Sequence, residues 1–127
     1  MLQRNLLDAV ATYIATIGMG SIGSNLFKMT MPESPHTCTA IVLSGGPVII
    51  GDPTNRPSFQ ILHRNTDINS GTTLIDSLYY ALHNQVNVLP NMNGFIEAKH
   101  LPGVHFRDDN NHPVFSLNFA FITTQQI

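Results

Sequence analysis

The stretch "GMGSIG" (18–23) has the glycine spacing of a turn that binds dinucleotides. Such a turn follows a buried strand and opens a helix, so that a pyrophosphate can approach the helix N-terminus. Here the preceding residues 2–17 carry apolar side chains at spacings of three and four, which predicts a helix, while "NLFKMTM" (25–31) predicts a strand. An acidic residue is also expected about 20 positions further on, where residues 40–43 are all apolar. The glycines therefore predict a helix-to-strand connection that needs positive φ, and no dinucleotide site.

The six histidines and the single cysteine are the candidate metal ligands. The histidines are His36, His63, His83, His100, His105 and His112. They form no H-x-H, H-x-x-x-H or H-E-x-x-H motif, and only His36 and Cys38 lie close together, whereas zinc takes three or four protein ligands. Cys38 begins an apolar segment, which favours a small buried side chain over a nucleophile. We expect no metal and no cofactor.

The remaining reactive side chains form no recognisable catalytic set. Asp108 and Asp109 fall in "DDNNHP", which is typical of a solvated turn and lacks the further acidic ligands of a calcium loop. Ser44 precedes two glycines but lacks the G-x-S-x-G arrangement of a hydrolase nucleophile. Phe115, Phe119 and Phe121 alternate on one strand face without basic neighbours, which favours core over base stacking. None of these residues assembles an active site.

Composition favours a subunit of an assembly. The chain has 127 residues, enough for one domain over residues 1–127, and only 11% of them are charged, against about 25% in a typical soluble domain. Surfaces with few charges cost less to desolvate against a neighbour. The six Lys and Arg residues are scattered, so no footprint for sequence-specific nucleic-acid binding is visible. One cysteine suits a reducing compartment, and no leader or 18-residue apolar run predicts secretion or a membrane span.

Periodicity and turn residues predict two helices and six strands. The helices are expected at 2–17 and 70–85, and the strands at 25–31, 38–44, 58–64, 95–101, 104–107 and 114–123. The order α-β-β-β-α-β-β-β predicts a single α+β domain. Its mostly antiparallel or mixed sheet would have both helices packed on one face.

The segment "GGPVIIGDPTNRP" (45–57) is the feature that turn chemistry does not explain. It places Val48, Ile49 and Ile50 within a run of glycines and prolines. One reading is an additional buried or edge strand. The other is a projecting arm that packs its apolar tip on a neighbouring subunit. The candidate interface residues of the arm are Gly45, Gly46, Pro47, Val48, Ile49 and Ile50.

From Gly18 to Arg64 the chain resembles the tail terminator family of long-tailed bacteriophages, also called minor capsid proteins. The matching elements are Gly18, Gly20 and Gly23; Leu26 and Phe27; Met31 to Pro35; Ala40 to Leu43; Gly45 to Pro47; Pro57 with Gln60; and Arg64. The motif "ALHN" (81–84) is similar as well. The chain departs from the family after Gly46, where "VIIGDPTN" replaces a proline-rich linker, and residues 87–113 cannot be mapped.

The resemblance implies a structural virion protein without enzyme activity or cofactor. It implies a ring of identical subunits, expected to be a hexamer, that caps the tail tube, ends its polymerisation and offers a docking surface to the filled head. The implied partners are further copies of the chain, the tail tube protein and a head-completion protein, with DNA passing through the lumen. The implied location is the head–tail junction of the virion, and the host cytoplasm during assembly. On this reading Arg56 and Arg64 lie near the subunit or tube contact.

Two other classes remain open from the sequence. A head-completion or stopper protein is also a small ring former without a cofactor. An enzyme or ligand-binding domain would rest on "GMGSIG" and the histidines, both of which lack the required context.

Overall fold

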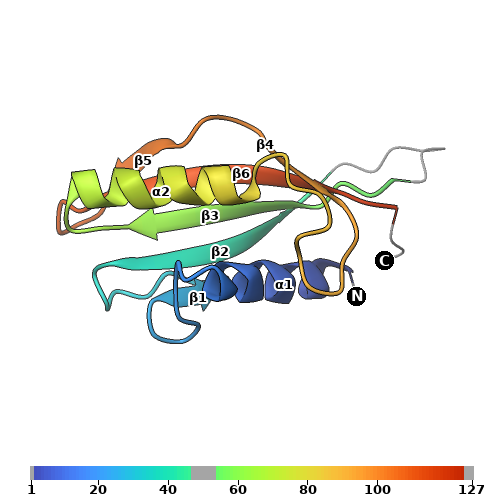
Figure 1. Cartoon of the computed structure of the whole chain (residues 1–127). Helices are drawn as coiled ribbons and strands as arrows, with labels where there is room; N and C mark the ends of the chain where they lie inside the picture. The colour runs from blue at the N-terminus through green and yellow to red at the C-terminus, as the bar shows by residue number, and fades with distance from the viewer. Residues whose placement is uncertain (1, 47–53, 125–127) are drawn as a thin grey trace.

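The computed structural model describes residues 2–46 and 54–124 (Figure 1). These residues form an α+β domain in which two helices pack on a mixed sheet, in the predicted order. The elements are α1 (Leu2–Thr16), β1 (Leu26–Lys28), β2 (Cys38–Gly45), β3 (Ser58–Arg64), α2 (Ile68–Leu82), β4 (Phe95–Ala98), β5 (Gly103–Arg107) and β6 (Pro113–Ile122).

The sheet is built around β6, its longest strand. The strand order is β1-β2-β3-β6-β4, and β5 also pairs with β6. Only β1 and β2 are parallel; the other pairs are antiparallel. β4 pairs with the second half of β6 and β5 with the first half, so both strands lie end to end along the edge of β6 that faces away from β3.

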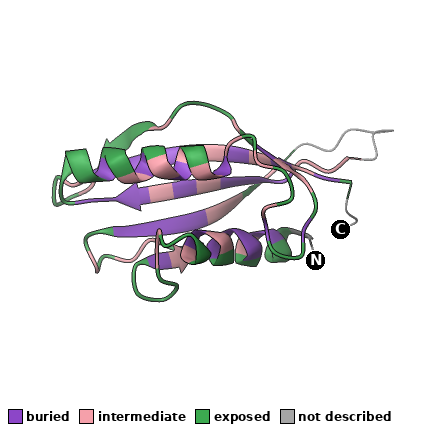
Figure 2. Cartoon of the chain, viewed as in Figure 1, coloured by how far each residue is buried: buried purple, intermediate pink, exposed green. Residues whose placement is uncertain are grey.

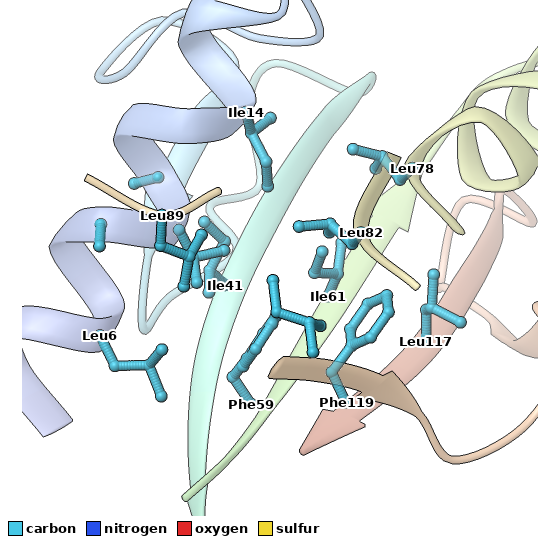
Figure 3. Packing of buried hydrophobic residues seen from close by; sticks show 14 of the residues in the cluster. Leu6, Ile14, Ile41, Phe59, Ile61, Leu78, Leu82, Leu89, Leu117 and Phe119 are labelled. Carbon is cyan, nitrogen blue, oxygen red and sulfur yellow. The ribbon is translucent and has the colours of Figure 1, made fainter. Parts of the chain in front are cut away.

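Both helices cover the same face of the sheet and share one core (Figure 3). Leu6 and Ile14 of α1 and Leu78 of α2 pack toward Ile41 and Ile61 at the sheet centre. The predicted aromatic core of β6 is confirmed. Its members Phe115, Leu117, Phe119 and Phe121 are at most 2% exposed. Burying each such side chain contributes roughly 1.5–3 kcal/mol.

Local chemistry sets the helix boundaries. Asp67 caps the N-terminus of α2 by accepting a hydrogen bond from the Ser70 backbone N–H, so the helix begins at Ile68, two residues before the expected start. α1 ends just before Gly18, which has φ +81°, and the backbone N–H of Met19 donates to the carbonyl of Ile14. This left-handed glycine closes the helix as expected. Among the described residues, no helix combines the length and apolar character needed to cross a bilayer.

Two strands are shorter than expected. β1 ends at Lys28 because Met29 has φ +69°, which an extended strand does not permit. β4 ends at Ala98 rather than near 101, and residues 99–102 leave the ladder before β5 begins at Gly103. The second helix also ends earlier, at Leu82, with His83 in an extended conformation. Asn84 and Asn87 then adopt positive φ in the connection to β4.

No helix covers the other face of the sheet in the described part of the chain. At its Arg64 end, residues 32–36 lie against this face, and Ala40 and Ser116 on it are buried. Residues aligned in register share a face, so Phe27, Ala40, Leu62 and Ser116 lie in one row across it. Val42, Gln60 and Asn118 form the next row. Figure 2 shows buried residues concentrated in the central strands and exposed ones at the outer elements.

Candidate subunit interface

The ends of the 45–57 segment are fixed on the sheet. Gly45 pairs with Ser58, and Asn55 exchanges backbone hydrogen bonds with Thr123, at 2.6 and 3.0 Å. The carbonyl of Pro57 accepts the backbone N–H of Phe121 at 2.8 Å. The segment is therefore a connection between adjacent antiparallel strands, with both ends held at the same end of the sheet. Pro47, Val48, Ile49 and Ile50 of the predicted arm lie outside the described residues.

Gly46 lies close to the backbone at the other end of this segment. A Cβ atom built on Gly46 would overlap the backbone carbonyl of Arg56. Glycine is therefore required here by the close approach of two backbone segments. Gly45 has φ +74° and open space around its missing side chain, so only its backbone conformation favours glycine.

Arg56 follows the predicted arm and is half-buried. Its Nε atom is shielded from solvent and has no hydrogen-bond partner in the described part of the chain. A buried donor without an acceptor is costly. A carbonyl or carboxylate from another segment or subunit would remove this cost.

Arg64 lies at the opposite end of β3 and is only 6% exposed. Its guanidinium donates to four backbone carbonyls of the β1–β2 connection. Nε donates to His36 at 2.9 Å, and Nη2 to Pro32 at 2.6 Å, Pro35 at 2.8 Å and Glu33 at 3.2 Å. Charged donors make the stronger class of hydrogen bond. Arg64 therefore anchors residues 32–36 to the sheet within one subunit.

The same guanidinium reaches the turn before β6. Arg64 Nε lies 3.8 Å from Asp108 Oδ2. The carboxylate of Asp108 also accepts the backbone N–H groups of His112 and Asn110, at 2.8 and 3.0 Å. The hydrogen bond from His112, followed by that from Asn110 and by the nearby charges, holds the pKa of Asp108 below its usual value despite some desolvation. The predicted turn at 108–113 is thus a capped, closed loop.

The two arginines that the sequence placed at one contact are far apart. They stand at opposite ends of β3, and eight residues of extended chain span roughly 25 Å. The structure groups Arg56 with Gly45 and Gly46, and groups Arg64 with residues 32–38 and Asp108. That Arg64 lies near a partner stays a prediction; its guanidinium already has acceptors within its own subunit.

A buried histidine network next to Arg64 has no counterpart in the sequence analysis. His63 is 2% exposed, and its Nδ1 lies 2.9 Å from Thr39 Oγ1 and its Nε2 3.1 Å from Asn65 Nδ2. Asn65 Oδ1 accepts the backbone N–H of Asp67, which orients the amide so that its Nδ2 donates to His63. His63 is then the neutral tautomer with the proton on Nδ1. Burial lowers its pKa to about 4, against a smaller opposing hydrogen bond with the Cys38 backbone.

The candidate metal ligands do not assemble into a site. No group of three or more His, Cys, Asp or Glu side chains in the described residues could hold a metal ion. The rings of His36 and His112 make an edge-to-face contact at 5.1 Å, and His83 stacks on Tyr79 at 4.9 Å. Cys38 is 1% exposed, and burial raises the pKa of its thiol, partly offset by Arg64. The expected small buried role of Cys38 is confirmed.

The sheet edges differ in what covers them. The outer backbone groups of Leu26 in β1 are used by the preceding turn: its N–H donates to Ser21, and its carbonyl accepts Gly23 N–H. The outer edge of β4 is covered by residues 84–87, where Asn84 N–H donates to Ile96 and Ile96 N–H donates to Gln85. All five residues of β5 are exposed, and β6 is its one strand partner among the described residues.

Large apolar side chains are exposed in the two segments that contain β1 and β5. One group, Ile17, Ile22 and Met29, belongs to the segment that contains β1. The other, Leu101, Val104 and Phe106, belongs to the segment that contains β5, with exposures from 48% to 74%. The sequence analysis missed both groups. The apolar residues of the second group can be seen in the sequence "LPGVHF" (101–106), but only the sheet order shows that this strand lies at an edge.

The fold and these surfaces define a small α+β domain with anchored loops and apolar edges, typical of a subunit that assembles with others. A family model for the bacteriophage tail terminator protein matches residues 13–125. The chain therefore belongs to the bacteriophage tail terminator family, whose members are structural proteins of the virion. A comparison with curated proteins found no significant match.

Proposed function

We propose that this protein forms a ring that caps the phage tail tube, ends its polymerisation and presents a docking surface for the filled head. The ring, expected to be a hexamer, would contact the tail tube protein on one side and a head-completion protein on the other. DNA would pass through its lumen. The protein would reside at the head–tail junction of the virion after assembly in the host cytoplasm.

The observation that carries this proposal is the family match over residues 13–125, which spans the last turn of α1, all of α2 and the complete sheet. The surface supports it. Few charges oppose burial against neighbours, and apolar side chains are exposed at two separate edges of the sheet. A closed ring needs two different contact surfaces on each subunit, which such edges supply.

The arm contributes to assembly in the same proposal. Gly45, Gly46 and Arg56 hold its base at one end of the sheet, and Pro47, Val48, Ile49 and Ile50 would reach the adjacent subunit or the tube. The unpartnered Nε of Arg56 supports this contact, since a neighbour's oxygen would satisfy it. Deleting residues 48–52 should abolish rings; intact rings from this deletion would remove the arm from the proposal.

Deleting the gene from the parent phage tests the function directly. Negative-stain electron microscopy of the lysate should show tails of uncontrolled length beside unjoined, DNA-filled heads. Complementation with the wild-type gene should restore tails of one length. Tails of normal length beside empty heads would instead identify a head stopper, and infectious virions would refute both functions.

A further inference from the structure

We infer that the β5 edge of one subunit packs against the β1 edge of the next copy of this chain, forming a head-to-tail contact between sheets. The inference rests on the proposed ring and names the surfaces that close it. Within the described residues, six of the nine large apolar side chains exposed to solvent fall in the two segments 17–29 and 101–106. The sheet order places these segments at opposite edges (Figure 1).

The two edges differ from each other, which favours a head-to-tail contact over a symmetric one. An edge that pairs with itself produces a twofold dimer, whereas two different edges on one subunit generate a ring when the rotation closes. The β1 segment offers Ile22 and Met29, with Ile17 directly after α1. The β5 segment offers Leu101, Val104 and Phe106. The register places Val104 on the helix-covered face with Phe115, and Phe106 on the opposite face with Val114, so the β5 edge is apolar on both faces. Each subunit carries both apolar edges, so the β5 edge of one copy has a matching apolar surface in the β1 edge of a second copy.

Strand directions fit this arrangement. β1 runs parallel to β2, and the antiparallel steps from β2 through β3 and β6 make β5 run opposite to β1. A rotation about an axis along the strands would therefore place β5 antiparallel to β1 of the next subunit. The outer N–H and carbonyl of Leu26 are already bonded to the 21–23 turn, so the contact is made chiefly by side chains.

The charges near the two edges are bonded within the subunit. Lys28 at the β1 edge is paired with Asp8 at 2.9 Å. Arg107 at the end of β5 keeps its charge and donates to the carbonyl of Asn111 at 2.9 Å. β5 also has a register shift between Val104 and Phe106. Such an irregularity limits unspecific backbone pairing with other exposed strands. The choice of partner then depends on how well the side chains fit.

Cysteine cross-linking tests the contact in the full chain. We would make Ile22→Cys and Phe106→Cys, singly and together, and add a bismaleimide at concentrations where the wild-type protein forms rings. If the free protein is monomeric, the reaction is carried out on tails isolated from the complemented phage. The wild-type chain is the control for Cys38, whose burial should leave it unreactive. Gln60→Cys, on the face of the sheet without helices, is the control for position.

The inference expects covalent dimers from mixed single variants and a ladder of multimers from the double variant. Dimers formed by Phe106→Cys alone would show a symmetric contact, and dimers formed only by Gln60→Cys would show that the sheet faces meet; either result overturns the inference. Ring-sized assemblies in which these cysteines do not cross-link would overturn the inference, whereas the absence of ring-sized assemblies, both in solution and on tails, would refute the proposed function itself.

A charge substitution gives an independent measurement. Phe106→Asp should weaken self-association at least tenfold by sedimentation, since a carboxylate would be buried against apolar side chains. Tyr80→Asp, which changes an apolar side chain that is 75% exposed on α2, is the matched control and should associate like wild type. Equal association of the Phe106→Asp protein and the control would overturn the inference.

Discussion

The two ends of β3 carry different kinds of interaction. At the Arg64 end, buried polar side chains bond to one another and to backbone carbonyls, so they hold together loops that are distant in the sequence. At the Arg56 end, backbone pairs hold the base of the arm, and Arg56 Nε is buried without a hydrogen-bond partner. His112 Nδ1, 3.8 Å from Asp108 Oδ2 at the other end, is buried without one as well. The first end completes the fold of one subunit, and the second is suited to a contact with another.

The largest effect on stability should come from replacing Arg64. Arg64→Met leaves four carbonyls of residues 32–36 without their charged donor, which should lower the free energy of unfolding by about 3–5 kcal/mol. Arg107→Met, at an exposed arginine with one backbone acceptor, should change it by no more than about 0.5 kcal/mol. Urea denaturation followed by circular dichroism measures both. Similar midpoints for the two variants would contradict the assigned role of Arg64.

Acidification should also weaken the Arg64 end. The pKa of His63 is about 4 in the folded chain and near 6.5 when unfolded, so the unfolded chain binds more protons between these values. The contribution of neutral, buried His63 to the free energy of unfolding is complete above pH 6.5 and is lost as the pH falls to 4. This contribution amounts to at most about 3 kcal/mol. His63→Gln should reduce this part of the pH dependence. An unchanged pH profile in the variant would show that other groups cause it.

A methyl group at Gly46 should have a moderate effect. Gly46→Ala forces the ends of the arm apart at Arg56, and we expect a loss of about 2 kcal/mol in unfolding free energy. Gly45→Ala places a side chain in open space at φ +74° and should cost only about 1 kcal/mol. Thermal unfolding of the two variants compares the cost of the steric overlap at Gly46 with the cost of the backbone conformation at Gly45. A larger loss for Gly45→Ala than for Gly46→Ala would mean that the chain near Gly46 moves readily to accommodate the methyl group.

The smallest effect on the free subunit should come from Arg56. Arg56→Met removes a buried donor that lacks a partner, so unfolding free energy should change by less than about 1 kcal/mol. Ring formation should nevertheless weaken, because the proposed acceptor belongs to another segment or subunit. Denaturation measures the stability of the subunit, and sedimentation measures ring formation, so the two effects can be separated. Full assembly of the variant would exclude Arg56 from the contact.

The sequence allowed the element order and the core to be predicted, because both depend on local periodicity. Phe115, Phe119 and Phe121 alternate on one strand, and Gly18 ends the first helix, as expected. The role of Arg64 could not be predicted, since its acceptors lie about 30 positions earlier in the chain and meet it only in the folded sheet. The exposed β5 edge could not be predicted either, because the strand order determines which strand lies outermost.

The seven residues of β3 are paired on both sides, with β2 along one edge and β6 along the other. A pull directed along these strands would load the two ladders in shear, so that many hydrogen bonds must break together. A pull across the sheet would instead peel short β1, one bond after another. The domain therefore has a mechanically strong axis parallel to β3 and a weak one perpendicular to it.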